Sequence, residues 1–263
     1  MGDAKKMTLL SDTWYLFVRY LKKLTRNPIL LFFSLFQPII FLVLFTQLFS
    51  ELSSFPGFLP EGVSYLEFAT AGILMQNAFG SALQSGTSIV LDIDSGFLQK
   101  MLVTPVKRPA ILLGRLLSDA FRVVVQSAII LGLSYALGGY VVTGVVGILL
   151  IFFTIAFFGL AWSGISLAIG MKTRSSETVF AIGGFITFPL LFLSTALVPS
   201  RSLPSWISTA SMFNPISYAV NANRTLMITG YDWPTILTAW GVIGLIAIIT
   251  LGATLYQFRK VVS

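Results

Sequence analysis

The side chains that most often carry out bond chemistry are scarce in this sequence. Its 263 residues include no cysteine and no histidine, which removes thiolate nucleophiles, thiolate metal ligands and the commonest general base. A phosphate-binding loop needs the pattern G-x-x-x-x-G-K-[ST], and the nearest approach, from Gly164 to Lys172, has the wrong spacing. We therefore predict no catalytic residue, no metal site and no cofactor bound by this chain, which would not itself be an enzyme.

The composition indicates a membrane protein. Hydrophobic residues make up 56% of the chain and charged residues only 10%, whereas soluble domains are about 25% charged. The apolar residues come in blocks, and several blocks reach the roughly 20 residues that a helix needs to cross a bilayer. The formal net charge of +7 then reflects orientation in the membrane rather than nucleic-acid binding. We predict an all-α integral membrane protein that contacts lipid and no nucleic acid.

The chain divides into six predicted spans within one transmembrane domain. Pro38 lies inside the first span and Pro189 inside the fifth, which membrane helices tolerate when neighbouring groups bond the freed carbonyl. Residues 199–234 are too polar to span, and Asn214-Pro215 is a typical helix start, so we expect short, re-entrant helices on the extracellular side. The spans are predicted at residues 29–49, 66–91, 111–137, 142–171, 178–198 and 235–258.

Residues 8–27 predict an amphipathic helix that lies in the membrane interface. Its polar side carries cations that would face lipid phosphates. A helix packed on a soluble partner is the alternative. The apolar side, at helical spacing, consists of Leu10, Trp14, Phe17, Leu21 and Leu24.

Lysine and arginine are unevenly distributed between the two sides that six spans define. Outside the spans, one side has only Arg201 and Arg224, and the other side has the remaining cations. Cytoplasmic segments are the ones enriched in Lys and Arg. We therefore predict a multi-pass protein of the prokaryotic inner (plasma) membrane with both termini in the cytoplasm.

The segment DIDSGFLQKMLVTPVKRP, residues 92–109, lies between the second and third spans on the predicted cytoplasmic side. It predicts a short helix at residues 94–105, because proline disfavours helical geometry in the residue before it. An exposed apolar helix face must be covered by lipid or by a protein groove. That face consists of Phe97, Leu98, Met101, Leu102 and Pro105.

The stretch from Gly96 to Asp119, GFLQKMLVTPVKRPAILLGRLLSD, resembles the cytoplasmic coupling segment of type-two ABC exporter permeases, especially the daunorubicin-resistance kind. Two other stretches agree with the same family, RNPILLFFSLFQPIIFLVLF in the first span and FNPISYAVNANRTLM before the last. The resemblance covers nearly the whole chain, with the motifs in order.

The resemblance implies a permease that pairs with a second copy or a sibling permease and with two copies of a separate ABC ATPase subunit. That subunit would bind ATP and magnesium, and the short cytoplasmic helix would dock in its groove. Two positions depart from the family: Gln99-Lys100 replaces a common acidic–basic pair, and Asn221 replaces a frequent acidic residue near Arg224. The implied coupling residues are Gly96, Phe97, Leu98, Lys100, Met101, Leu102, Thr104 and Pro105.

The second span has polar residues within a narrow arc at about 100° per residue. Polar groups are costly against lipid, so this stripe faces either a wet substrate path or another helix. The resemblance implies that the first, second and fifth spans enclose the path. The candidate path residues are Gln37, Thr70, Asn77, Ser81, Gln84, Ser88 and Thr187.

Three charged residues of the third span, Arg115, Asp119 and Arg122, are spaced so that neighbours can bond along one helix face. They lie near the predicted cytoplasmic end, where long side chains can extend to water. We therefore expect them to have a structural role.

These observations favour the membrane subunit of an ATP-driven exporter that forms the translocation path for a hydrophobic or amphiphilic, drug-like or lipid-like substrate. A polysaccharide or lipid-linked glycan exporter permease is the alternative. A secondary transporter is less favoured, because such proteins usually have inverted repeats and carboxylates in mid-span. A membrane scaffold would tolerate loss of both the polar stripe and the cytoplasmic helix.

Overall fold

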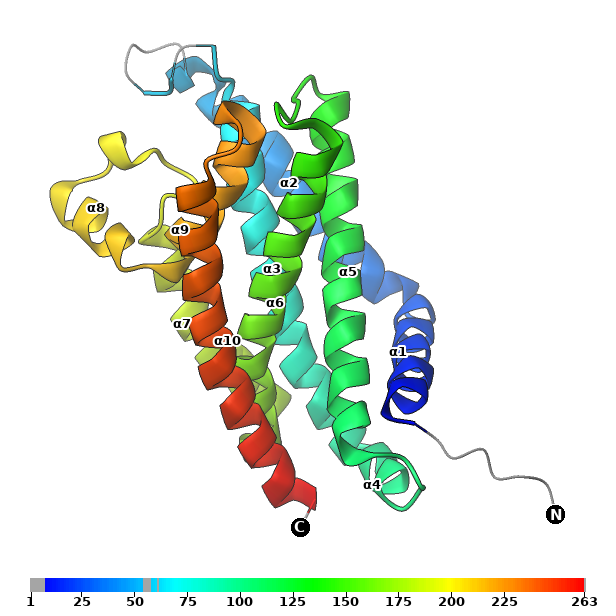
Figure 1. Ribbon diagram of the computed structural model, residues 1–263. Helices are drawn as coiled ribbons and strands as arrows, with labels where there is room; N and C mark the ends of the chain where they lie inside the picture. Colours follow the sequence, from blue (N-terminus) through cyan, green and yellow to red (C-terminus); the bar gives the residue numbers. More distant parts are fainter. Residues whose placement is uncertain (1–7, 54–57, 61, 263) are drawn as a thin grey trace.

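The computed structural model describes residues 8–53, 58–60 and 62–262, and all regular secondary structure in this part of the chain is helical. The long helices stand side by side in one bundle (Figure 1). This confirms the all-α class. The helices are α1 (Leu9–Thr25), α2 (Pro28–Ser53), α3 (Tyr65–Asp94), α4 (Phe97–Leu102), α5 (Arg108–Ala136), α6 (Gly144–Thr173), α7 (Ser176–Phe192), η1 (Ser200–Ser202), α8 (Ser205–Met212), α9 (Pro215–Arg224), the π-helix η2 (Thr225–Thr229) and α10 (Trp233–Val262).

Local sequence signals set several helix ends. Ser64 and Glu67 form a reciprocal capping box at the start of α3, which satisfies backbone donors that a helix start leaves free. The side chain of Asn214 accepts a hydrogen bond from the backbone N of Ile216 at 3.0 Å, so the predicted start of α9 is confirmed. Gly96 has φ 67°, a left-handed conformation that glycine adopts without strain, and it separates α4 from α3.

Four helices of the described chain are long and apolar enough to cross a membrane. The apolar helix α7 is shorter, at 17 residues. α3 has 30 residues, but polar groups along one side lower its hydropathy. The protein is therefore an integral membrane protein with several spans. The four are Leu31–Phe49 within α2, Arg108–Ala136, Gly144–Thr173 and Trp233–Lys260 within α10.

The helix expected over residues 178–198 ends earlier, at Phe192. A side chain from outside the helix explains the early end, because Asn214 Nδ2 donates to the carbonyl oxygens of Leu190 and Leu193 at 2.5 and 3.0 Å. These carbonyls obtain partners without a continuing helix. The cytoplasmic helix is likewise shorter than expected, since α4 has only six residues.

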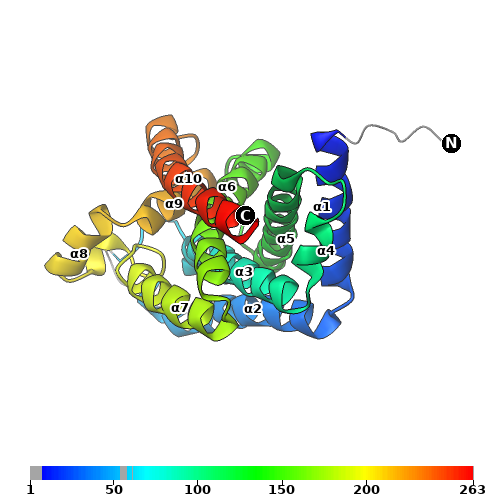
Figure 2. The same ribbon diagram turned by 90° about the horizontal axis from the view of Figure 1, so that it is seen from below.

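α3 and α6 form the centre of the bundle (Figure 2). An added Cβ at Gly170 of α6 would lie 2.6 Å from the carbonyl oxygen of Gly86 in α3, so only glycine permits this close approach. Ser166 Oγ donates to the carbonyl of Ala82 at 2.5 Å in the same region. The other helices are arranged around this central pair.

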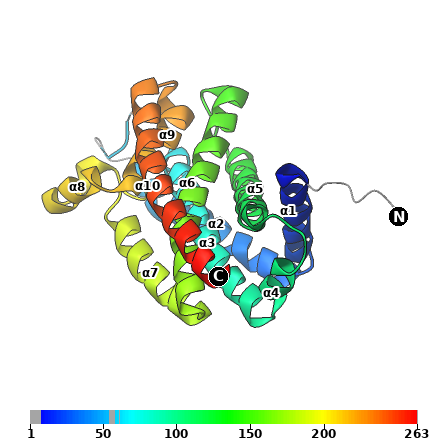
Figure 3. The ribbon, with the colours of Figure 1, turned by 60° about the horizontal axis from the view of Figure 1, so that its bottom comes forward.

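One end of the bundle brings together α1, α4 and the end of α10, and α4 lies beside α1 there (Figure 3). We call this the lower end, as in Figure 1. Leu16 of α1 packs against Gly114 of α5. On the apolar side of α1, Leu10 and Trp14 are exposed.

Candidate functional site

Polar side chains pair α3 with the antiparallel helix α5 along most of their length. We call this the α3–α5 seam. The stripe predicted on α3 therefore faces mainly another helix, which was one of its two predicted roles. From the lower end upward, the bonded pairs are Asp92–Arg115, Ser85–Asp119, Ser81–Arg122, Asn77–Ser127 and Thr70–Ser134.

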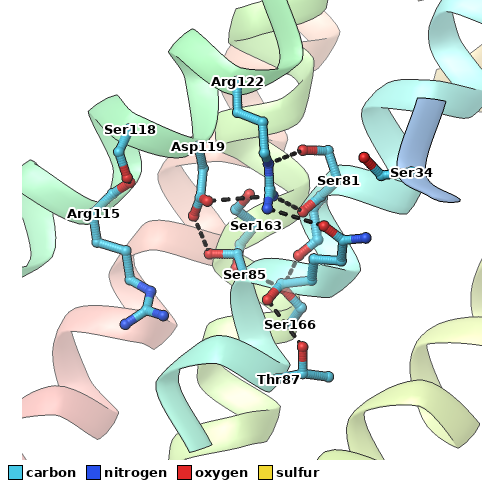
Figure 4. A network of polar contacts seen from close by, with 12 residues as sticks. Ser34, Ser81, Ser85, Thr87, Arg115, Ser118, Asp119, Arg122, Ser163 and Ser166 are labelled. Atoms are coloured by element: carbon cyan, nitrogen blue, oxygen red, sulfur yellow. Dashed lines mark hydrogen bonds and ion pairs between the residues drawn. The ribbon is translucent and has the colours of Figure 1, made fainter. Parts of the chain in front are cut away.

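Arg122 is the centre of the seam (Figure 4). Its Nε donates to Ser81 Oγ at 2.9 Å and its Nη2 to the Ser81 carbonyl at 2.7 Å. Its Nη1 donates to Gln84 Oε1 at 3.0 Å, and Asp119 Oδ1 lies 3.3 Å from Nη2. Every guanidinium nitrogen thus has a partner. A buried arginine with a carboxylate and several acceptors is a stable arrangement.

Arg115 forms a second buried ion pair below it. Its Nη1 lies 2.8 Å from Asp92 Oδ2, and Lys23 Nζ lies 2.7 Å from Asp92 Oδ1. Arg115 is 2% exposed and Arg122 is 7% exposed. The expectation that these side chains extend to water is therefore wrong, because carboxylates and polar groups inside the protein bind them. Asp92 links α1, α3 and α5.

A small polar cavity of about 70 Å³ lies between α2, α3 and α5. The side-chain oxygens of Gln76 and Gln126 are buried there without a hydrogen-bond partner in the described part of the chain. The cavity therefore offers unused acceptors. Four of the predicted path residues line it: Gln37, Asn77, Ser81 and Gln84.

A larger cleft of about 490 Å³ lies next to this cavity toward the lower end. Gln84 lines both spaces, so they follow one another along α3. The predicted path residue Ser88 lines the cleft together with Arg122, and apolar contacts come from Leu24 of α1 and Phe180 of α7. The cleft thus combines polar and apolar walls.

Two predicted path residues lie outside these spaces. The hydroxyl of Thr70 donates to the Leu66 carbonyl at 2.6 Å and lies 3.0 Å from the Ser134 hydroxyl, so it is part of the helix contact. Thr187 is buried in α7, and its hydroxyl has no partner in the described chain. The structure gathers Gln37 of α2 with the path residues of α3 from Asn77 to Ser88, and leaves these two apart.

The apolar side of α4 is largely covered by this chain itself. Leu98 is fully buried and Met101 is 5% exposed. Both belong to a core cluster with Leu16 and Tyr20 of α1 and Ile111 of α5, and Phe97 and Leu102 are partly buried against it. The apolar face of α4 was expected to dock in a groove of another protein. In the structure this face is not open, because α1 already covers it.

The opposite side of α4 is exposed at the lower end. Val103, directly after the helix, is 86% exposed, and the predicted coupling residues Lys100, Thr104 and Pro105 are exposed beside it. Gly96 supplies the turn that orients this side. A partner protein would meet these residues rather than the buried apolar face.

Contacts from α1 hold the α4 segment at both ends. The Arg19 guanidinium lies 3.3 Å from the ring centroid of Phe97, a cation–π contact. Burial lowers the pKa of Arg19 from its ordinary value, yet an arginine stays charged. Asp12 is buried and its carboxylate accepts from the backbone N of Lys107 at 3.0 Å. Sequence reasoning missed Asp12, whose one signal is a carboxylate within an otherwise basic helix.

The family model described as "ABC-2 type transporter" matches residues 11–228. The chain is 32% identical over 200 residues to the daunorubicin resistance ABC transporter permease protein DrrB1 of Streptomyces coeruleorubidus, covering 76% of this chain and 69% of that protein. It is 28% identical over 253 residues to the putative transport permease ycf38 of Pyropia yezoensis, covering 93% and 84%.

A third similar protein is the probable multidrug ABC transporter permease YbhR of Escherichia coli strain K12, at 23% identity over 157 residues, 59% of this chain and 42% of that protein. The residues matched by the family model include α4 and the whole α3–α5 seam.

Proposed function

We propose that this chain forms the translocation path for a hydrophobic or amphiphilic substrate. The chain belongs to the ABC-2 type transporter family and is the membrane subunit of an ABC exporter. The observation that carries this proposal is the pair of adjoining spaces beside the α3–α5 seam, the polar cavity and the larger cleft. Free amide oxygens would bind polar atoms of the cargo, and apolar walls would contact the rest of it.

Gln37 gives the sharpest test of this path. It is exposed on α2, it lines the polar cavity, and it is not part of the α3–α5 seam. Replacing it by leucine removes a polar wall and leaves the ion pairs in place. We expect Gln37→Leu to reduce ATP-dependent accumulation of daunorubicin in inverted membrane vesicles by about tenfold, the effect of losing roughly 1.4 kcal/mol.

Gln47→Leu, on the same helix but outside the cavity, is the control and should transport like the wild type. Daunorubicin is chosen because the DrrB1 permease is named for resistance to it. If Gln37→Leu transported daunorubicin as well as the wild type, the polar cavity would not be part of the translocation path. The absence of any ATP-dependent drug movement would contradict the proposed substrate class.

We propose that a separate ATP-binding subunit, with its ATP and magnesium, docks on the exposed side of α4. Two copies of it would act with two permeases, either two copies of this chain or this chain and a sibling. Buried Leu98 and Met101 fix α4 to the bundle, while Lys100, Val103 and Thr104 face outward. A push on the exposed side is therefore passed to α1, α3 and α5.

Val103→Asp tests this docking surface. Val103 is exposed, so the substitution leaves the core intact and places a charge where the partner would bind. We expect the ATP-binding subunit to be lost from the purified complex. Val142→Asp, an exposed valine at the other end of the bundle, should keep it. Full recovery of the subunit with Val103→Asp would rule out this surface.

We propose that α3 and α7 also span the membrane, which gives six spans, with both termini and α4 in the cytoplasm of a prokaryotic cell. Because the chain has no cysteine, single cysteines report the topology cleanly. A membrane-impermeant maleimide should label Ser202→Cys in intact cells and Thr104→Cys only after permeabilisation. The reverse labelling pattern would overturn the orientation.

A further inference from the structure

A pocket of about 510 Å³ is lined by residues of the upper part of α3, the segment after α7, α8 and α9. These elements lie remote from α4 (Figure 1). We call it the α8–α9 pocket. One part of its wall is apolar, with Phe68 and Met212, and another part contains Arg201, Asn221 and Arg224. Among the described residues that line it there are two arginines and no carboxylate. The pocket is therefore amphiphilic and positively charged.

Arg224 is held in this pocket by neutral groups only. Its Nη2 donates to the carbonyl oxygens of Thr195 and Ala196 at 2.8 and 3.2 Å, and its Nη1 donates to Asn221 Oδ1 at 3.3 Å. The guanidinium carbon lies 3.6 Å from the ring centroid of Phe68. Its Nε is buried and has no hydrogen-bond partner in the described chain. The cation is fixed in position, but these contacts do not neutralise its charge.

Arg224 is half-buried, and a charge that is partly removed from water without a counter-charge is unfavourable, because water no longer solvates it fully. Arg115 and Arg122 each have a carboxylate within 3.3 Å, and Arg224 forms no ion pair among the described residues. Arginine binds phosphate oxygens well, since its planar fork presents several donors. The π-helix η2 begins directly after Arg224, and such segments are frequent at functional sites.

We propose that the α8–α9 pocket binds a phosphate group carried by an amphiphilic molecule. Arg224 contacts the phosphate oxygens, Arg201 adds a second positive charge at the exposed rim, and the apolar wall with Phe58 and Met212 contacts the apolar part of the ligand. This site lies apart from the polar cavity and from α4, so it depends on neither the proposed path nor the proposed docking surface.

Binding of dioctanoyl phosphatidic acid to the purified chain in detergent tests the site. Intrinsic fluorescence follows binding, because Trp206 is exposed on α8, the helix that also supplies Ser208 and Met212 to the pocket. Neutral dioctanoylglycerol and inorganic phosphate are the comparison probes. We expect saturable binding of phosphatidic acid at least about tenfold tighter than that of dioctanoylglycerol, since hydrogen bonds to a charged group contribute roughly 1.5–3 kcal/mol.

Asn221→Asp is the decisive variant. It places a carboxylate beside the guanidinium, where Asn221 Oδ1 already lies 3.3 Å from Nη1, and it keeps Arg224 on the carbonyls of Thr195 and Ala196. We expect about tenfold weaker binding of phosphatidic acid, on the same energy scale. Arg224→Gln should weaken it as much, and Arg201→Gln should weaken it less because Arg201 is exposed. Arg259→Gln, an exposed arginine at the lower end, is the control.

If inorganic phosphate competes with phosphatidic acid, the site is supported and a phosphate group alone is enough to bind. If phosphatidic acid binds and inorganic phosphate does not compete, the site is supported and its ligand is a lipid. Equal binding of dioctanoylglycerol would overturn the proposal. Wild-type affinity in both Asn221→Asp and Arg224→Gln would also overturn it. None of these results depends on ATP, transport or the partner subunit, so they are separate from the tests of export.

Discussion

The lower part of the α3–α5 seam contains a buried arginine and the α8–α9 pocket a half-buried one, and the two regions treat the charge differently. Arg115 pairs with Asp92, which also binds Lys23, whereas Arg224 contacts carbonyls, an amide and an aromatic ring. A paired charge holds helices together, and an unpaired one remains able to bind an anion. This difference fits a structural role for the first region and the anion-binding role that we propose for the second.

The two regions also differ in how their backbone is arranged. At the lower end, α1, α3 and α5 are continuous helices joined by Asp92, so they respond together when α4 is displaced. Near the α8–α9 pocket, α7 has ended and short helices follow. Irregular segments open locally more easily than long helices. The lower end is thus suited to transmit movement and the other region to admit a ligand.

The largest effect is expected for Asp92→Asn. This change leaves the buried Arg115 without its carboxylate, and breaking a buried ion pair costs about 3–5 kcal/mol. We expect a marked fall in the thermal unfolding midpoint of the purified chain. Asp94→Asn, an exposed carboxylate on the same helix, should leave it unchanged. Equal midpoints for the two variants would show that the seam does not depend on this pair.

A smaller effect is expected for Gly72→Ala, which tests how the segment after α7 packs on α3. An added Cβ would collide with the carbonyl oxygen of Ala196, a backbone atom that cannot turn aside. Such overpacking typically costs about 1–3 kcal/mol. Gly80→Ala on the same helix is the control, because nothing lies within 4 Å of its added Cβ. If the thermal unfolding midpoint of Gly72→Ala were as high as that of Gly80→Ala, the segment after α7 would not pack on α3 at this position.

The smallest effect is expected for Asn221→Asp, which would make the two regions alike. The new carboxylate gives Arg224 a counter-charge, and we expect the free energy of unfolding to rise by up to about 1 kcal/mol, as for a partly exposed ion pair. The gain should disappear in the Arg224→Gln background, where the pair cannot form. Equal gains in both backgrounds would contradict the idea that Arg224 lacks a counter-charge.

The sequence predicts the lower end better than the α8–α9 region. Apolar blocks and caps locate α2, α5, α6 and α10 to within a few residues, because these signals are local. The early end of α7 could not be predicted, because it depends on Asn214, which is distant in the sequence. A proline such as Pro189 marks a possible break but does not say which side chains will bind the freed carbonyls.

The candidate site shows the same limit. The polar stripe of α3 is visible from helical spacing, but periodicity does not identify the facing helix. Arg115 and Arg122 were expected to have a structural role, but their partners Asp92 and Ser81 become evident only once α3 and α5 lie antiparallel. Likewise, the apolar face of α4 predicts a covering surface but not that α1 supplies it.

We propose that ATP drives this permease through the exposed side of α4. Proteoliposomes that contain the permease and its co-purifying ATP-binding subunit would measure it directly, by following uptake of an amphiphilic drug with and without ATP. We predict ATP-dependent uptake in the wild type and its loss in Val103→Asp, with an unchanged thermal unfolding midpoint. Uptake that needs no ATP, or that continues unchanged in Val103→Asp, would contradict this account.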